Sequence, residues 1–497
     1  MTSSSTQAAG FCVAEQAFIP VVDASGNRKE LSLADALVQA HEIRQIACGS
    51  PLETLAIYRL LLAVAMRTHP VADEHDWSAL WELGRYDADE IAVYCGRWRN
   101  RLDLFSPDHP WMQDPAIRGA GLNTDSPARL RHDLASGNNQ TLFDHSRDDL
   151  PTALEPAAAA RALLAAQAFA VQGGQSRPFY LSDAPLVGGV RLLLLGGNLF
   201  ETLVLNTIPP DRTGLSLGED RPAWEADELP APRKEGTVAE GPLDLLTWNS
   251  RSVLFSRSPD GLVTGCCVQQ RLKLDSVACP DPWTPFRKSK EKGWLPVRVQ
   301  PGRAVWRDSA ALLAFAGDDE RCALLAWAAR LREMGILPDR PYRLLATGLC
   351  NRQAKVEAWR SESLPLPVPY LERPALATLV AAAMEDAEKA GKTLRRALGE
   401  VARELGVRRD ANADAVTAFW SSLEPPFLSL LVALPDAAGS IDIEAAVSEW
   451  RGTVWSSAVR VFDTAADGIA TNARAMRAVA RGRVALLGRR GTQENPE

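Results

Sequence analysis

The sequence lacks the short motifs that mark common catalytic sites. It contains no GxxxxGK[ST] phosphate loop and no GxSxG nucleophile turn. Its glycine-paired apolar stretch, "VGGVRLLLLGG" at 187–197, has the wrong glycine spacing for a dinucleotide-binding turn, and no acidic residue follows at the required distance. In a chain of 497 residues these absences favour a binding role over catalysis, so we expect no enzyme activity.

The cysteines and histidines also form no pattern typical of a disulfide framework or of a zinc site. Its eight cysteines are scattered, which favours the reducing cytoplasm. Cys266 and Cys267 are adjacent, whereas a zinc knuckle needs two spacer residues between its thiolates. We therefore expect neither a metal nor a cofactor. The six histidines occur singly, but two His/Asp pairs leave open a metal-dependent phosphohydrolase or nuclease that uses His132, Asp133, Asp144 and His145.

Long hydrophobic runs are missing as well. No segment of about 18 uncharged apolar residues is present, and the first residues show no basic region followed by an apolar core. We expect neither a membrane span nor a secretory signal, and hence a cytoplasmic protein.

Positive charge is in deficit overall but concentrated locally. The net charge of −7 argues against a chain coated uniformly by nucleic acid, although a local basic groove remains compatible with it. The segment 287–307 holds seven Lys or Arg residues against one Glu. Such runs are often solvated faces; here they are candidate phosphate contacts. A second basic cluster near the end of the chain comprises Arg474, Arg477, Arg481, Arg483, Arg489 and Arg490.

The length and the pattern of apolar residues predict more than one domain. Ser50 and Pro51 mark the start of an apolar helix, 114–155 is a long polar loop, an alanine-rich helix covers 156–171, and 243–308 consists of several strands. Four prolines in "SLPLPVPYLERP" indicate a linker rather than a regular element. Beyond it, apolar residues three and four apart predict helices at about 372–404, 410–432, 441–465 and 468–488.

These patterns predict an α+β protein. We expect a mixed α/β domain over 1–364, a proline-rich linker over 365–374 and a four-helix bundle over 375–497.

Several stretches in a fixed order carry a family resemblance. They are "FIPVVDASGNRKELSLADAL", "SPLETLAIYRLLLAVAMR", "HPWMQ", "ASGNNQTLFDH", "AAQAFAVQGG", "GGNLFETLVLN" and "GLCNRQAKVEAW", followed by the helical tail. Together they resemble the CasA family, the large subunit of the type I-E CRISPR surveillance complex Cascade, over about residues 15–490. The resemblance implies a large α/β domain of unusual fold followed by a four-helix bundle.

The resemblance also implies a function without catalysis. A protein of this family recognises a short protospacer-adjacent motif (PAM) in double-stranded DNA, helps to open the duplex for guide-RNA pairing and recruits a helicase–nuclease. The less specific alternative is an interaction scaffold that binds only other proteins.

Within "GLCNRQAKVEAW" the resemblance implies a polar wedge that splits the first base pair. Its residues are Asn351, Arg352, Gln353 at the tip, and Ala354. Inserting a side chain between base steps unstacks them at a cost of about a few kcal/mol. Taken alone, the stretch is a polar turn at the start of a short helix.

Two further DNA contacts and a docking loop follow from the resemblance. Gly173 and Gly174 match a glycine loop that approaches the minor groove, or else they cap a helix. The family's minor-groove lysine finger aligns near Gln270, which is not a lysine, so Arg271 or Lys273 is the candidate, or the strand face is merely solvated. The resemblance also implies a docking loop that seats the subunit near the 5′ end of the guide RNA; its residues are Asn138, Asn139, Thr141, Leu142 and Phe143. Alternatively, this is a surface loop whose Phe143 packs into the core.

Overall fold

The structure is a computed structural model of the whole chain, and it falls into two compact units. It describes residues 10–132, 152–173, 179–289, 291, 293–313, 322–352, 354–406, 413–437, 439–467, 469–470 and 472–488. The first unit comprises residues up to Arg303, Phe315–Pro338 and Arg343–Ser363, and the second comprises Ala304–Ala314, Asp339–Tyr342 and Leu364 onward. No sequence pattern assigns 304–314 or 339–342 to the second unit, and the predicted domain boundaries remain a prediction.

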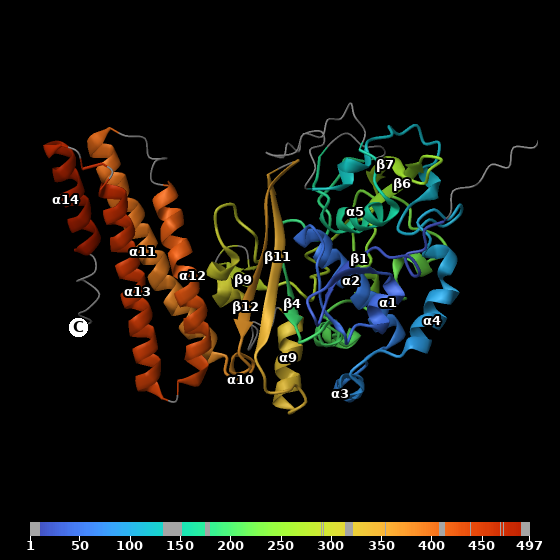
Figure 1. Cartoon of the computed structure of the whole chain (residues 1–497), viewed down its shortest axis with the longest axis horizontal. Helices are drawn as coiled ribbons and strands as arrows, with labels where there is room; N and C mark the ends of the chain where they lie inside the picture. The colour runs from blue at the N-terminus through green and yellow to red at the C-terminus, as the bar shows by residue number, and fades with distance from the viewer. Residues whose placement is uncertain are drawn as a thin grey trace, which may run out of the picture. The chain divides into compact units, whose positions relative to one another are not determined.

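The first unit begins with a small sheet beside a buried helix. Strand β1 (Ile19–Asp23) pairs antiparallel with β2 (Arg28–Leu31) and with β3 (Ile43–Ile46). Helix α2 (Pro51–Thr68) begins as predicted, because the Ser50 side chain accepts a hydrogen bond from the Leu52 amide and Pro51 occupies the first turn. Almost the whole helix is buried, and it contacts several neighbouring helices (Figure 1). Those helices are α1 (Leu33–Val38), α4 (Ala88–Arg97), α5 (Pro156–Phe169), α6 (Leu199–Leu205) and α7 (Pro242–Leu246).

Six further strands of the first unit form three small two-stranded sheets. Strand β6 (Arg251–Arg257) pairs antiparallel with β7 (Val263–Gln270), β9 (Phe286–Ser289) with β10 (Gly293–Pro296), and β5 (Gly236–Thr237) runs parallel to β8 (Lys273–Leu274). The predicted strands within 243–308 are therefore confirmed. Helices α3 (Glu74–Leu83) and α9 (Ala323–Glu333) also belong to this unit.

The stretch "GLCNRQAKVEAW" forms a β-hairpin, so the short helix predicted there is wrong. Strand β11 (Tyr342–Arg352) is followed by β12 (Lys355–Leu366), in the sheet order β12-β11-β4 with β4 (Val190–Leu195). Gly348 lies within β11, where a Cβ atom would stand 2.7 Å from the Gly189 carbonyl oxygen and 2.8 Å from Val299. The glycine therefore permits close packing between neighbouring chain segments rather than starting a helix.

The proline-rich segment also contains regular structure, contrary to the linker prediction. Strand β12 continues to Leu366, and a short helix α10 (Pro369–Glu372) follows. Leu366, Tyr370 and Leu371 are buried, so the apolar side chains of this segment belong to the core.

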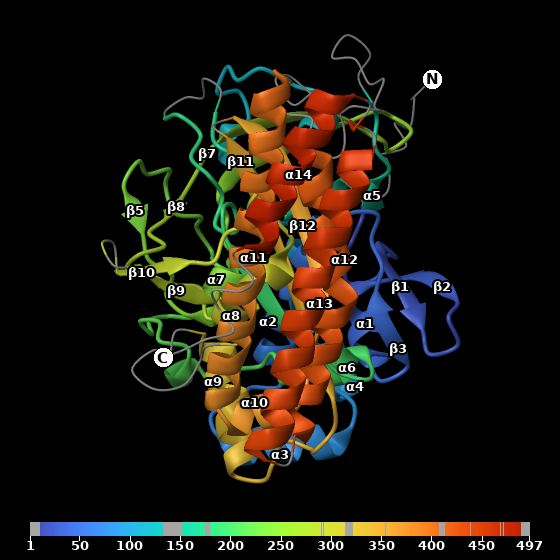
Figure 2. The same ribbon diagram turned by 90° about the vertical axis from the view of Figure 1, so that its left-hand side faces the viewer.

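The second unit contains the four predicted long helices, side by side in Figure 2. They are α11 (Ala375–Leu405), α12 (Ala413–Asp436), α13 (Ser440–Asp467) and α14 (Ala473–Leu487), with a short helix α8 (Ser309–Leu312) beside α11. Helix α11 contacts the other three long helices. The α+β prediction with C-terminal helices is confirmed.

One described helix, α12, is long and apolar enough to cross a membrane by length and composition. Core helices of bundles share this profile, and Phe419, Trp420 and Phe427 of α12 are buried within the second unit.

Candidate nucleic-acid interface

The tip of the β11–β12 hairpin carries the residues expected to form the wedge. Arg352 is exposed, and Asn351 and Ala354 are half-buried. The Asn351 side chain donates from Nδ2 to Oδ1 of Asp183 at 3.0 Å. Gln353 lies outside the described residues.

Gly173 lies directly against this tip. Its φ of +127° is in the region that favours glycine, and an added Cβ would lie 2.5 Å from the Ala354 Cβ. The Gly173 amide donates to the Leu181 carbonyl at 3.3 Å, whereas Gly174 lies outside the described residues. The structure thus brings together two elements separated by about 180 positions in the sequence.

Asp183 connects these two elements through one carboxylate oxygen. Its Oδ1 accepts from the Gln172 amide at 2.7 Å as well as from Asn351. Hydrogen bonds to an ionised acceptor are shorter and stronger than neutral ones. Asp183 therefore fixes the hairpin tip relative to the glycine turn, a role that no local sequence pattern indicated.

A buried arginine, Arg251, joins the backbone segments next to this contact. Arg251 donates to the Ala170 carbonyl at 3.1 Å, to Gln270 Oε1 at 3.2 Å and to the Ser182 carbonyl. Burial lowers the pKa of the guanidinium to about 10, so it remains charged at neutral pH. The end of α5, the segment around Ser182 and the end of β7 are thereby held together.

The two candidates for the minor-groove finger differ in exposure. Arg271 is 2% exposed; its Nη1 lies 3.1 Å from Asp114 Oδ2, and its Nη2 donates to the Pro230 carbonyl at 3.0 Å. Burial lowers the pKa of Arg271, and the Asp114 charge opposes that shift. Lys273 is exposed, so of the two only Lys273 presents its charge to solvent.

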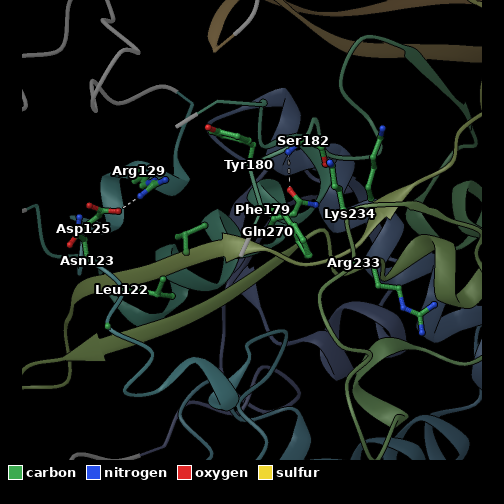
Figure 3. Close-up of a pocket in the computed structure, with 13 residues that line it drawn as sticks. Leu122, Asn123, Asp125, Arg129, Phe179, Tyr180, Ser182, Arg233, Lys234 and Gln270 are labelled. Carbon is green, nitrogen blue, oxygen red and sulfur yellow. Dashed lines mark hydrogen bonds and ion pairs between the residues drawn. The ribbon is translucent and has the colours of Figure 1, made fainter. Parts of the chain in front are cut away.

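Lys273 borders a basic groove with a volume of about 830 Å³. Arg129, Arg233 and Lys234 also line it. Figure 3 shows the hydrogen bond from the Ser182 backbone amide to Oε1 of Gln270, two further lining residues. Arg129 is paired with Asp125, whereas Arg233 and Lys234 are exposed. Tyr180 on the groove wall is 76% exposed. Cations and an exposed aromatic ring are the side chains that bind phosphates and unpaired bases.

The other predicted sites receive less structural description. The docking residues 138–143 lie outside the described residues, as do Asp133, Asp144 and His145. His132 Nε2 lies 2.9 Å from the Phe169 carbonyl oxygen. Within the described ranges no three His, Cys, Asp or Glu residues are grouped so that they hold a metal.

The two basic clusters are only partly available to phosphates. Arg287 and Arg298 are exposed, but Arg307 pairs with Glu388 at 2.6 Å and lies over the Trp420 ring. In the second cluster Arg477 is exposed, and Arg489 and Arg490 lie outside the described residues. Arg474 donates to the Glu404 carbonyl oxygen, while Arg481 and Arg483 form ion pairs with Glu404 and Asp463.

Comparison with known proteins gives consistent matches along the chain. A family model described as CRISPR-associated protein Cse1 matches residues 13–461. The chain is 33% identical over 500 residues to the CRISPR-associated protein CasA/Cse1 of Thermus thermophilus, covering 95% of each chain. Cse1 of Thermobifida fusca has a similar structure, with a TM-score of 0.81 and 25% identity over 96% of this chain and 97% of that one.

A chain of a solved CRISPR RNA-guided surveillance complex matches with a TM-score of 0.80 over 96% of this chain and 99% of that chain. At 24% identity, this last similarity concerns the fold alone.

Proposed function

Because the chain belongs to the CasA/Cse1 family of CRISPR-associated proteins, we propose that it is the large subunit of a type I-E RNA-guided Cascade complex. In this role it inspects double-stranded DNA for a PAM, helps to open the duplex for guide-RNA pairing and recruits a helicase–nuclease. The fold shared with a chain of an RNA-guided surveillance complex supports this assignment. A protein that tests many sites reads a few base pairs and leaves the sequence to base pairing.

The contact between Gly173 and Ala354, with both segments joined to Asp183, is the observation that carries the proposal. A glycine turn without a Cβ allows the backbone to approach the minor groove closely. A polar hairpin tip fixed beside it is suited to enter the duplex next to the base pairs that the turn contacts. We assign the glycine role to Gly173 and Gly174 and the wedge to residues 351–354, with Gln353 as the tip.

The basic groove supplies the electrostatic part of the interaction. Lys273 replaces the family's finger in this proposal, and Arg233 and Lys234 contact phosphates on the path that leads to the hairpin. These contacts position the duplex and do not read its sequence. The exposed arginines of 287–307 and of α14 contribute further phosphate contacts.

The remaining roles concern partners. The segment 138–143 seats the subunit near the 5′ end of the guide RNA and against the other Cascade subunits, with Phe143 as its anchor. The recruited helicase–nuclease carries out the chemistry on DNA, in the cytoplasm, and this subunit is not itself an enzyme.

The test uses the assembled complex and a target duplex with a fluorescent base at the first position to be opened. Gln353→Ala should slow opening across a panel of flanking trinucleotides, because the amide no longer replaces the lost base-pair contacts. Gln45→Ala, which removes an exposed glutamine on β3, is the matched control and should open DNA at the wild-type rate. Unchanged opening by Gln353→Ala would show that the wedge assignment is wrong.

A further inference from the structure

One aromatic residue on the wall of the basic groove, Tyr180, faces solvent. Its side chain is 76% exposed and makes no hydrogen bond or ring contact with any residue that the structure describes. In Figure 3 its ring lies clear of the other labelled side chains, with Arg129 to its left and Lys234 to its right. A single exposed aromatic residue is not unusual, so its surroundings decide what it can bind.

Tyr180 lies where the groove meets the hairpin tip. The carbonyl oxygen of the next residue, Leu181, accepts a hydrogen bond from the Gly173 amide at 3.3 Å. Asp183, two residues further along, accepts from Asn351 of the hairpin tip at 3.0 Å. The backbone next to the ring is therefore attached to both elements that we assign to the opening of the duplex.

Three cations of the groove are brought together by strand pairing. Strand β5 runs parallel to β8 with Gly236 opposite Lys273, and the Arg233 amide donates to the Arg271 carbonyl at 3.0 Å. These contacts place Arg233 and Lys234 beside Lys273, although about 40 positions separate them in the sequence. All three side chains are exposed, and within the described part of the chain none of them forms an ion pair.

The groove carries an excess of positive charge. The residues that line it include four cations and one carboxylate, Asp125, which already pairs with Arg129. A local field of this kind attracts phosphates even though the net charge of the chain is −7. The groove thus combines unpaired cations with an exposed aromatic ring.

A base can stack on this ring only after it has left a duplex. Paired bases are covered by their neighbours in the stack and present their edges, not their faces, to the grooves. Sites for single strands combine cations that follow the backbone with aromatic rings on which unpaired bases stack. The combination found here therefore fits a single strand, whereas a closed duplex would leave the ring of Tyr180 without a partner.

We propose that the basic groove holds the DNA strand that is displaced on opening, with Tyr180 stacked on one of its unpaired bases. This inference rests on the proposed function, because there the target strand pairs with the guide RNA and the displaced strand keeps its bases unpaired. Lys273, Arg233 and Lys234 keep their role, since a phosphate contact does not depend on whether the base is paired. Stacking also opposes reclosing, because the base on Tyr180 is unavailable to its former partner.

Anisotropy of a labelled single-stranded oligonucleotide tests the groove with the full chain alone. Tyr180→Ala and Tyr180→Leu should weaken binding about 5- to 150-fold, the range for the loss of one stacked base, whereas Tyr180→Phe should keep the wild-type affinity. Val277→Ala is the matched control, because it shortens a side chain that is 91% exposed and does not line the groove. Absent binding, or equal affinity of Tyr180→Ala and the wild type, overturns this inference and leaves the proposed function intact.

The cations have a separate signature in the same assay. Lys234→Met should lower the slope of log affinity against log salt by about 0.7, the value for one phosphate of a single strand. Tyr180→Ala should leave the slope unchanged, since stacking on a ring releases no counterions. A slope that Lys234→Met does not change contradicts the placement of the strand in this groove.

A fluorescent base, 2-aminopurine, identifies the strand in the assembled complex. Because stacking quenches its fluorescence, a probe at the first displaced positions should be brighter with Tyr180→Ala than with the wild type or Tyr180→Phe. The same probe in the target strand, or at the 5′ end of the guide RNA, should not respond. A response of either of those probes, without one in the displaced strand, shows that the assignment to the displaced strand is wrong.

A duplex with mismatches at the first few positions separates this role from that of the wedge. These positions are already open, so Gln353→Ala should have little effect on the probe, whereas Tyr180→Ala should still make it brighter. Equal fluorescence of Tyr180→Ala and the wild type on this duplex overturns the inference. A wild-type complex that fails to open a matched duplex contradicts the proposed function instead, and with it the choice of the displaced strand.

Discussion

Replacing Gly173 by alanine adds one methyl group at the contact between the glycine turn and the hairpin tip. The new Cβ would lie 2.5 Å from the Ala354 Cβ, whereas ordinary contacts begin near 3.4 Å. The residue also has a φ of +127°, which costs a non-glycine residue about 1–3 kcal/mol. The turn or the tip must therefore move, and we expect target-duplex opening to fall more than overall stability.

The expected loss of stability is small on the scale of the whole chain. A cost of about 1–3 kcal/mol, spread over a unit of this size, lowers the melting temperature by about 1–4 °C. Gly26→Ala is the matched control, since its φ is +88° and nothing lies within 4 Å of an added Cβ. This control should show a similar thermal shift and wild-type duplex opening.

A double-mutant cycle with Ala354→Gly separates steric contact from backbone strain. Ala354→Gly removes the atom that the new methyl group would meet, so it should restore part of the opening rate in the Gly173→Ala background. Coupling between contacting residues is typically about 0.5–3 kcal/mol. If the two changes are additive, or if Gly173→Ala opens DNA at the wild-type rate, the contact has no part in opening.

Further predictions concern the basic groove, the hydrogen bonds to Asp183, the buried carboxyl group of Asp244 and the metal-dependent nuclease alternative. Lys273→Met should lower the slope of log affinity against log salt by about 0.9 in a salt titration of the assembled complex, and an unchanged slope would place this charge away from phosphate. Asp183→Leu should slow duplex opening in stopped-flow fluorescence, since Asn351 loses its acceptor; equal rates would refute the connection. Burial raises the pKa of Asp244 to about 6 from its ordinary 3.8. The folded state therefore binds this proton more tightly than the unfolded state. In urea unfolding, the free energy of unfolding should fall by on the order of 2 kcal/mol as the pH rises from about 4 to 6, and level off above pH 6. Asp244→Asn should remove that fall. Purified protein should not cleave DNA when Mn²⁺ is added. Mn²⁺-dependent cleavage that is lost in His132→Ala would favour the metal-dependent phosphohydrolase or nuclease.

The elements predicted correctly from the sequence are those encoded by local patterns. The long helices of the second unit follow from apolar residues three and four apart, and α2 follows from Ser50 and Pro51 at its start. The hairpin of β11 and β12 was missed because its polar tip contains good helix formers, which led to the prediction of a short helix. Its close contacts with Gly189 and Val299 depend on distant segments, which periodicity does not encode.

The candidate site was predictable only in part for the same reason. The resemblance led to the glycine turn and the hairpin tip, but not to the residues that hold them together. Asp183 and Asn351 are 168 positions apart, and Arg251 is 81 positions from Ala170. The burial of Arg271, which distinguishes it from Lys273, likewise depends on Asp114, 157 positions away.

The support of the hairpin tip matters because a wedge works only if it is stiffer than the base step that it enters. Unstacking a step costs about a few kcal/mol, and a tip held by less than that would deflect instead of opening the duplex. Each hydrogen bond to the Asp183 carboxylate contributes about 1.5–3 kcal/mol, so the pair is of the same magnitude as the unstacking cost. On the proposed function, if either hydrogen bond is lost, the free energy that holds the tip in place falls below the cost of unstacking the base step. Arg251 donates to the carbonyl oxygen of Ser182, the residue before Asp183, so on the proposed function this buried arginine also supports the hairpin tip.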